Sequence, residues 1–358
     1  MIIKNLKIEK FRKFVDFSMD FPFNITVIKG ENAVGKTTII EAINCLSTIK
    51  SFRTNNNVEL INEKFDYFYL ETIISTKTNN NFVSFYCDKN IKRVKVNGKI
   101  VKKLSEYIGL FNVVCFSSLD FLKLKGSSSN RREIFELVLC QISKDYLDAC
   151  NCYKKFLKDR NTLLKSLGLQ NRNDLRVLLD VVNEQLIEYG NKIVGYRKRF
   201  IEKISLLGNK IHYDISNKQE DFCVKYAPCS ELLSKEGYAL KLEEDIKRGY
   251  TTIGPHRDDY IFLVNGKNVA IYGSQGQQRN ALLSVKLAIA DLIFETKKEA
   301  PTLLLDDVFS ELDKNRQNAL VNYLINKYQT ILTTASTSDL DNKLLNNAFV
   351  VELDKRSE

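Results

Sequence analysis

Short apolar runs alternate with turn residues over residues 1–100, which is the pattern of β-strands. Residues 21–29 fit one strand, and residues 93–101 fit a hairpin around the turn pair Asn97-Gly98. The same turn pair recurs at Asn265-Gly266. We therefore expect strands joined by tight turns in the first and the last part of the chain.

The middle of the chain has a helical pattern. Apolar residues recur in steps of four and three over residues 135–167 and again over 175–207, with a turn expected at 168–172. Arg160 alone interrupts the first series. Two helices joined by so short a turn should pack antiparallel, each about 50 Å long at ~1.5 Å per residue. The pattern predicts a projecting arm, with an ordinary helical subdomain as the alternative.

A mixed pattern returns from Thr251 onwards. We expect a helix over 278–295, an apolar strand at 303–305, a helix over 314–326 and a last strand at 330–333. A length of 358 residues suits about two domains. The prediction is an α/β domain built from both ends of the chain, residues 1–120 and 250–358, with an α-helical antiparallel helix-pair domain inserted at 121–249.

Composition narrows the class of partner. Lys and Arg total 54 against 44 Asp and Glu, a formal net charge of +10 that favours a polyanion such as nucleic acid, although solubility alone could explain it. No apolar run approaches the ~18 residues of a membrane span, and the amino terminus lacks a signal-peptide core, so a cytoplasmic location is expected. The 8 cysteines lack C-x-x-C spacing and should be reduced thiols.

A phosphate-binding loop is predicted at residues 30–37, GENAVGKT, which match G-x-x-x-x-G-K-[ST]. Backbone N–H groups of such a loop surround phosphates, the lysine reaches the β- and γ-phosphates, and the hydroxyl can bind Mg²⁺. A predicted strand enters the loop and a helix leaves it, so the helix start faces the anion. The predicted nucleotide-binding residues are Gly30, Glu31, Asn32, Ala33, Val34, Gly35, Lys36, Thr37 and Thr38.

Two adjacent carboxylates, Asp306 and Asp307, follow the apolar strand at 303–305. Alone, such a pair is more often a helix N-cap, but beside a phosphate loop it fits the other half of a nucleoside triphosphate site. Asp306 would then hold Mg²⁺ together with Thr37, and Asp307 would orient the attacking water. Many ATPases that combine such a phosphate loop with an acidic pair after a strand carry Glu at the position of Asp307.

Residues 274–278, SQGQQ, resemble the S-x-G-x-Q signature of the ABC ATPase superfamily, and residues 310–313, SELD, resemble its D-loop. The resemblance implies an ABC-type head that binds ATP and Mg²⁺. It also implies that the signature, Ser274, Gly276 and Gln278, contacts the γ-phosphate held by another subunit, with Ser310 and Asp313 in the D-loop. One loop and one signature per chain imply an ATP-dependent homodimer.

The chain resembles the RecF family of DNA-repair ATPases over essentially its whole length. The residues that carry this resemblance are TIGPHRDD at 252–259, YGSQGQQR at 272–279, FRKF at 11–14, SFR at 51–53 and the segment from Gly126 to Arg131-Arg132. The chain departs from the family at 117–120, SSLD, where Ser-Pro-Glu-Asp is usual. Thr333-Thr334 stand where transporter ATPases carry a switch histidine. In this the chain is similar to RecF and unlike a transporter, and the γ-phosphate sensor is unassigned.

The RecF resemblance implies a role in recombinational DNA repair, replication and SOS induction. The implied partners are DNA (single-stranded, duplex or gapped), RecR and, indirectly, RecO and RecA. His256 is expected to be a structural hydrogen-bonding residue. Basic residues that could neutralise DNA phosphates are Arg53, Arg131, Arg132, Arg257, Arg197, Lys198 and Arg199.

Two other functions remain open from the sequence. An ABC-type ATPase that drives a transporter or another protein assembly would need a switch histidine and a short coupling insertion. A structural SMC-like tether would need much longer coiled coils and a hinge. The sequence contains neither set of features.

Overall fold

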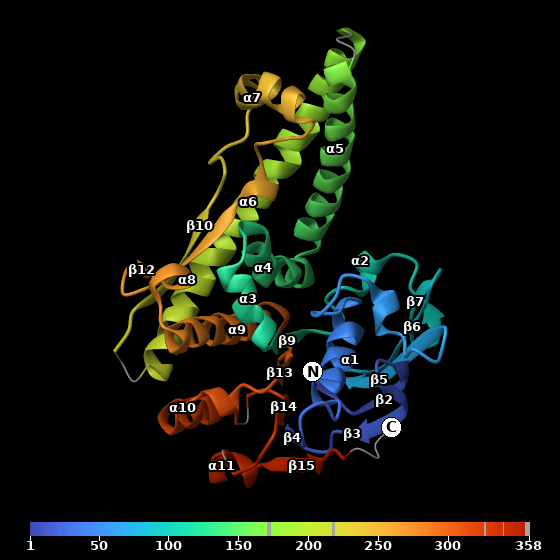
Figure 1. Cartoon of the computed structure of the whole chain (residues 1–358), viewed down its shortest axis with the longest axis vertical. Helices are drawn as coiled ribbons and strands as arrows, with labels where there is room; N and C mark the ends of the chain where they lie inside the picture. Colours follow the sequence, from blue (N-terminus) through green and yellow to red (C-terminus); the bar gives the residue numbers. More distant parts are fainter. Residues whose placement is uncertain (170–172, 217–218, 326, 339, 355–358) are drawn as a thin grey trace.

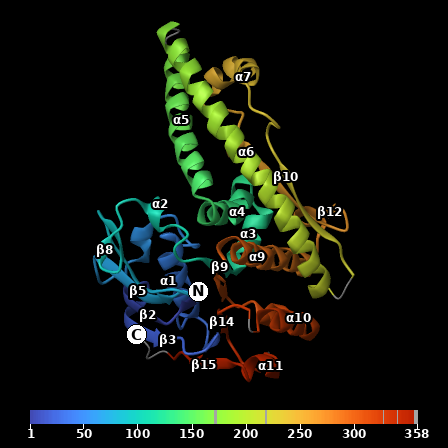
Figure 2. The same ribbon diagram turned by 180° about the vertical axis from the view of Figure 1, so that it is seen from behind.

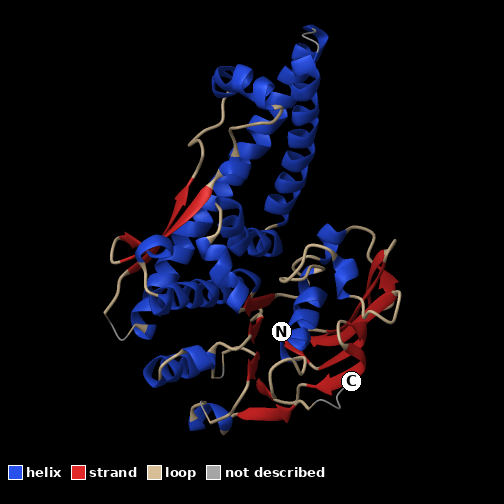
Figure 3. Ribbon diagram, in the orientation of Figure 1, coloured by secondary structure: helices blue, strands red, loops and turns tan. Residues whose placement is uncertain are grey.

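The computed structural model describes residues 1–169, 173–216, 219–325, 327–338 and 340–354. The parallel and antiparallel sheets form the lower part of the molecule together with α1 (Lys36–Thr48), α9 (Gln275–Lys297) and α10 (Lys314–Leu324) (Figure 1). The helices α5 (Lys144–Leu169) and α6 (Asn173–Ile215) project from it, with α7 (Lys235–Arg248) alongside. Colouring by secondary structure shows that the projecting part consists almost entirely of helices (Figure 3). The predicted arm is therefore present.

A parallel sheet forms the centre of the lower part, in the strand order β15-β4-β14-β13-β9. Its side chains alternate between two apolar cores: Leu303 and Leu305 enter one, while Leu304 enters the other. Burial on both faces explains why these strands are continuous apolar runs. The predicted last strand is followed by a further, outer strand. The strands are β4 (Ile25–Lys29), β9 (Val113–Phe116), β13 (Thr302–Leu305), β14 (Thr330–Thr334) and β15 (Ala348–Glu352).

A second, antiparallel sheet has the order β3-β2-β5-β6-β7-β8, with β1 paired to β5. The predicted hairpin is confirmed, because Asn97 (φ 50°) and Gly98 (φ 78°) take the left-handed conformations of a tight turn between β7 and β8. The strands are β1 (Ile2–Ile3), β2 (Asn5–Phe11), β3 (Phe14–Asp20), β5 (Tyr67–Ser75), β6 (Asn80–Asp88), β7 (Lys92–Val96) and β8 (Lys99–Ile100).

The helices of the arm differ from the prediction at one point. Ser143 adopts an extended conformation and its hydroxyl accepts a hydrogen bond from the Tyr146 amide, which ends α4 (Ser128–Ile142) and begins α5 (Lys144–Leu169). The returning helix, α6 (Asn173–Ile215), spans 43 residues, about 64 Å at ~1.5 Å per residue. The predicted turn at 168–172 lies partly outside the described residues.

Arg160, which interrupts the apolar series, is fully buried. Its guanidinium donates to Asn183 Oδ1 of α6 (2.7 Å), Asp245 Oδ2 of α7 (2.6 Å) and Thr251 Oγ1 (2.8 Å). The interruption is thus a buried ion pair that joins α5, α6 and α7 (Lys235–Arg248).

One predicted boundary of the inserted domain falls inside a helix, and the other divides a pair of hydrogen-bonded strands. The boundary after residue 120 lies within α3 (Ser118–Lys125). The boundary at 249/250 separates β10 (Phe222–Ala227) from β11 (Asp259–Val264), although these strands pair antiparallel and β11 continues through the Asn265-Gly266 turn to β12 (Lys267–Asn268). The arm and the lower part therefore share a sheet and a core.

The remaining helices complete the lower part (Figure 2). These helices are α1 (Lys36–Thr48), α2 (Leu104–Tyr107), α8 (Val269–Tyr272), α9 (Gln275–Lys297), α10 (Lys314–Leu324) and α11 (Asn342–Leu345), with short 3₁₀ turns at Asn57–Leu60, Pro255–Arg257 and Phe309–Glu311.

Among the described residues, no helix is both long and apolar enough to cross a membrane. All 8 cysteines are free thiols, and Cys229 is exposed.

Candidate nucleotide-binding site

The predicted phosphate loop connects the end of β4 to the start of α1. Gly35 caps α1 with φ 105°, and a Cβ there would lie 2.7 Å from the Phe14 ring, so only glycine fits. The first turn of α1 contains no acidic residue. The first N–H groups of a helix have no acceptor within the helix, and those of α1 face the loop as a site for an anion.

Lys36 is buried at the start of α1. Its ammonium donates to the carbonyls of Gly30 (2.7 Å) and Glu31 (2.9 Å), so it lies across the loop. Held in this position, the lysine adds its positive charge to that of the helix start. Both features favour a phosphate chain at this loop.

Asp306, at the end of β13, lies beside the start of α1. Both of its carboxylate oxygens are 3.0 Å from Thr37 Oγ1, and Thr333 Oγ1, on the adjacent strand β14, donates to Oδ1 at 2.8 Å. Burial raises the pKa of the Asp306 carboxyl. Carboxylate and hydroxyl oxygens are ligands that Mg²⁺ accepts, and a cation would offset the cost of the buried charge. The Thr37–Asp306 pair therefore fits a Mg²⁺ ion.

Asp307 is half-buried and adopts a left-handed backbone conformation (φ 54°). Its amide donates to Thr333 Oγ1 at 3.0 Å, and its carbonyl accepts from Ser310 Oγ at 2.9 Å. The predicted D-loop therefore begins in contact with the acidic pair. Asp313 ends this segment as the N-cap of α10.

Thr333 is a site residue whose role the sequence does not reveal. In the sequence, Thr333 only marks the place where transporter ATPases carry a switch histidine. Its hydroxyl joins the Asp306 carboxylate to the Asp307 amide, so it fixes both acidic residues. The signal was available in principle, since parallel neighbouring strands bring their carboxyl ends to one edge of the sheet.

The predicted signature lies at the start of α9. Ser274 is exposed and forms a capping box with Gln277, accepting from its amide at 3.2 Å and donating its own amide to Gln277 Oε1 at 3.0 Å. Gly276 follows in the first turn of the helix, packed beside Arg316. A serine hydroxyl that accepts one bond still has its proton to donate, and here it stands at a helix N-terminus.

Gln278 corrects one part of the signature prediction. Its side chain is buried, and Nε2 donates to the carbonyls of Val269 and Gly273, both at 3.0 Å. It holds α8 against α9 within its own chain and cannot face another subunit. Ser274 and Gly276 are the members of the motif that the surface presents.

The signature and the phosphate loop lie on opposite sides of the parallel sheet. Figure 1 shows α8 and the start of α9 on one side of β13 and β14, and α1 on the other. A nucleotide on the loop of one chain therefore lies away from the signature of the same chain. Asp306, Asp307 and the D-loop, by contrast, are brought together with the phosphate loop.

The prediction that Arg197 contacts DNA is wrong, because its side chain is buried. It donates to Glu136 Oε1 (2.7 Å), Asp258 Oδ2 (2.7 Å) and the Pro255 carbonyl (2.6 Å). Arg197 therefore joins α6 to α4 and to the GPHRDD segment. Arg197 lies on the inward-facing side of α6. The sequence cluster Arg197-Lys198-Arg199 alone does not indicate which side of the helix that is.

Three other basic candidates lie at the same joint. Arg131 forms a bidentate ion pair with Asp259 (2.8 and 2.7 Å), and Arg132 donates to the Asp258 carbonyl (2.6 Å). Arg257 donates to the Thr251 carbonyl (3.3 Å). Arg131 and Arg132 are half-buried, and their guanidinium groups stabilise the junction between the arm and the lower part. Arg257 is exposed, so DNA contact stays a prediction for it.

Arg53, Lys198 and Arg199 are the remaining basic candidates. Arg53 and Arg199 are exposed, and Lys198 is half-buried. Arg53 pairs with the buried Glu41 (3.2 Å), and Lys198 pairs with exposed Glu231. Arg199 stacks on the Tyr196 ring. DNA contact stays a prediction for these three residues as well.

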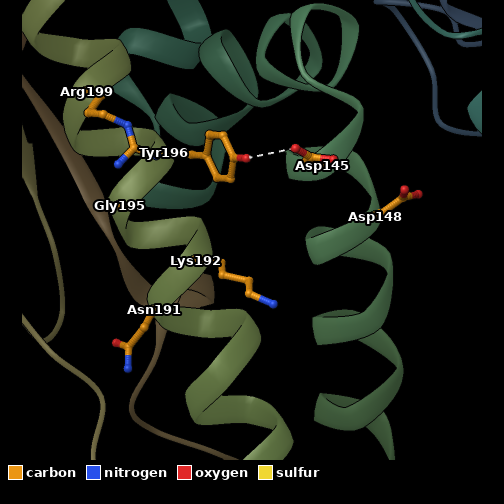
Figure 4. A pocket seen from close by; sticks show the side chains of 7 residues that line it. All are labelled: Asp145, Asp148, Asn191, Lys192, Gly195, Tyr196 and Arg199. Atoms are coloured by element: carbon orange, nitrogen blue, oxygen red, sulfur yellow. Dashed lines mark hydrogen bonds between the residues drawn. The ribbon is translucent and has the colours of Figure 1, made fainter.

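A cleft of about 580 Å³ lies between α5 and α6 beside Arg199. Figure 4 shows Asp145 and Asp148 on α5, with Tyr196 of α6 hydrogen-bonded to Asp145 (3.4 Å) and Arg199 also on α6. The other lining residues are Asn191, Lys192 and Gly195.

His256 is a structural residue, as expected. Its Nδ1 accepts from the Tyr153 hydroxyl (2.9 Å), and its Nε2 donates to the Thr251 carbonyl (3.1 Å), because a carbonyl only accepts. Burial lowers the pKa of His256 to about 4. The neutral ring is fully bonded, and a proton on Nδ1 would break the bond from Tyr153.

The free energy of unfolding is expected to fall as the pH decreases from about 6.5 towards about 4. The unfolded chain takes up a proton at His256 near pH ~6.5, whereas the folded chain does not, so stability is lost by up to ~1.4 kcal/mol per pH unit from this group. Urea unfolding of wild-type protein and of His256→Gln at about pH 7 and about pH 5 measures the effect. Equal pH dependence in both proteins would contradict this assignment.

Comparisons with known proteins agree with these features. The family model described as RecF/RecN/SMC N terminal domain matches residues 2–355. A DNA replication and repair protein RecF of Staphylococcus epidermidis is 38% identical and one of Bacillus subtilis 39%, with 97% of each chain covered in both cases. A solved structure of the recombination mediator protein RecF with ATP superposes with a TM-score of 0.87 at 33% identity, over 95% of this chain and 93% of that one. An Smc head domain of Pyrococcus furiosus, at a TM-score of 0.56 and 15% identity, shares the fold.

Proposed function

The chain belongs to the RecF family of DNA replication and repair proteins, and from that premise we propose that it is an ATP-dependent DNA-binding switch. In this proposal ATP binding joins two copies of the chain on DNA, and hydrolysis releases them. The ATP-bound RecF relative supports ATP as the nucleotide.

One observation carries the proposal: the groups that suit a triphosphate are divided between two sides of the same chain. Lys36 and Thr37 begin α1, which packs on one face of the parallel sheet, and Asp306 lies beside Thr37 at the carboxyl end of β13. Ser274 begins α9, which packs on the other face. A second copy, related by a twofold axis, would bring its signature to the phosphate loop of the first copy. The signature of the first copy would meet the phosphate loop of the second in the same way. Two nucleotides would then lie between the two chains.

Each residue has a chemical role in this arrangement. The α1 amides and Lys36 bind the phosphates, and Thr37 and Asp306 hold Mg²⁺, which would neutralise charge on the phosphate oxygens. Asp307 orients the water that attacks the γ-phosphate, and Thr333 binds both the Asp306 carboxylate and the Asp307 amide. The partner's signature hydroxyl donates to the γ-phosphate, which makes dimerisation depend on ATP.

The proposed partner is DNA, in single-stranded, duplex or gapped form. The net charge of +10 supports a polyanionic partner, and the proposed phosphate contacts are Arg53, Lys198, Arg199 and Arg257. By analogy with the RecF relatives, we place the chain in recombinational repair with RecR, and indirectly with RecO and RecA at gaps and in SOS induction.

Sedimentation velocity of Asp307→Asn with labelled duplex and gapped DNA tests the proposal. Asparagine tolerates the left-handed backbone at this position, so the variant should fold and bind ATP but scarcely hydrolyse it. We expect a dimer that carries DNA in the presence of Mg-ATP and a free monomer without nucleotide. A dimer that ignores DNA would instead favour an ATPase of protein assembly.

A further inference from the structure

The support of the signature serine extends beyond α9 to the end of the arm helix. Ser274 depends on Gln277, whose side-chain oxygen accepts from the Ser274 amide at 3.0 Å. The other end of that amide, Gln277 Nε2, donates to Glu220 Oε1 at 2.7 Å. Glu220 precedes β10 and is largely covered, with 17% of its side chain exposed.

Glu220 is itself held by a buried residue of α6. His212, which is fully buried, places Nε2 3.1 Å from Glu220 Oε2 and Nδ1 3.1 Å from Ser284 Oγ of α9. The His212 ring also stacks on Phe222, with ring centroids 5.0 Å apart. The carboxylate of Glu220 is therefore fixed from one side by the arm helix and turned with its other oxygen towards the signature.

The chemistry of Glu220 decides which way the Gln277 amide points. A carboxylate only accepts hydrogen bonds, so it binds the NH₂ end of Gln277 and leaves the oxygen for the Ser274 amide. If the Gln277 amide turned over, its oxygen would face the carboxylate and its NH₂ would face the Ser274 N–H, and both bonds would be lost. Glu220 thus selects the one orientation that completes the capping box.

Helix α10, which follows the D-loop, contacts the signature at Gly276. Arg316 of α10 pairs with Asp313 (3.2 Å), and its NH1 would lie 3.3 Å from a Cβ at Gly276. Arg316 of α10 therefore lies close beside Gly276, while Ser274 stays exposed.

We propose that Glu220 is a positioning residue for the signature, acting on Ser274 through Gln277 and held in place by His212 of the arm helix. This inference rests on the proposed function, because it concerns the surface that meets the nucleotide of a second copy. Through this contact, α6 links the arm to the motif that closes the dimer.

The test compares Glu220→Ala with Glu220→Gln, both in the Asp307→Asn background that retains ATP. The alanine variant should bind a fluorescent ATP analogue as a monomer with unchanged affinity, since the phosphate loop is untouched. Its ATP-dependent dimerisation should weaken at least roughly tenfold, because each dimer uses the signature twice. Glutamine can still present an oxygen to Gln277, so its dimerisation should stay within roughly threefold of the parent.

Several outcomes would overturn the inference. These are unimpaired dimerisation of Glu220→Ala, a Glu220→Gln protein as impaired as the alanine variant, or equal loss of ATP affinity and dimerisation. Gln277→Ala removes the same bonds from the other end and should reproduce the loss, with no further loss in the double variant. It serves as the test if Glu220→Ala does not fold. Failure of the Asp307→Asn parent to dimerise would reject the proposed function itself.

Discussion

Lys36→Ala is expected to abolish ATP-dependent dimerisation and to weaken ATP binding roughly tenfold to a hundredfold, the range for a hydrogen bond to a charged group. The ammonium of Lys36 is buried at the start of α1 and is the cation nearest to the loop carbonyls. Without it, the β- and γ-phosphates would keep the α1 amides and the proposed Mg²⁺ but would lose a buried positive charge. Titration of a fluorescent ATP analogue, with sedimentation velocity, measures both effects.

Lys50→Ala is the matched control for this variant, because Lys50 is an exposed lysine shortly after the end of α1. It removes the same charge from the same part of the chain and should leave ATP binding and dimerisation unchanged. Normal ATP affinity and dimerisation in folded Lys36→Ala protein would show that the loop assignment is wrong.

Ser274→Arg is expected to leave ATP binding by the monomer intact and to weaken dimerisation by roughly a hundredfold or more. The serine is exposed at the start of α9, and the larger cationic side chain would occupy the space in which the proposed second copy presents its nucleotide. The change also removes an N-cap, which costs about 1 kcal/mol of stability. Sedimentation velocity with and without Mg-ATP measures the loss of dimer.

Ser234→Arg separates these two effects. Ser234 is the N-cap of α7 in the arm, and its hydroxyl accepts from the Gly237 amide as that of Ser274 does from Gln277. The control therefore loses a comparable cap away from the signature, and it should dimerise normally. If Ser274→Arg dimerised as well as this control, the signature assignment would have to be abandoned.

The features that the sequence predicted well are local ones. The phosphate loop, the hairpin at Asn97-Gly98 and the apolar strand before Asp306 each depend on residues that are close together in the chain. Backbone geometry and burial on both faces of the parallel sheet determine such patterns directly. The arm was likewise visible in its helical period.

The features that the sequence did not reveal depend on distant partners. The sequence predicts Arg197 as a possible DNA contact, but its ion-pair partner Asp258 lies 61 positions away, and Arg160 is buried against residues of two other helices. Thr333 acquires its role only when β14 pairs with β13. Charge and spacing along one helix cannot tell such a buried arginine from a solvated one, because the difference lies in what packs against it.

Mixing Lys36→Ala with Ser274→Arg tests most directly whether the ATP site is shared between two chains. Neither variant alone should hydrolyse ATP. In a mixed dimer, the phosphate loop of the Ser274→Arg chain meets the signature of the Lys36→Ala chain, so one of the two sites is intact. We expect phosphate release by an equal mixture to reach between about a quarter and about a half of the wild-type rate. A mixture as inactive as the separate variants, despite full folding of both, would contradict a site composed of two copies of this chain.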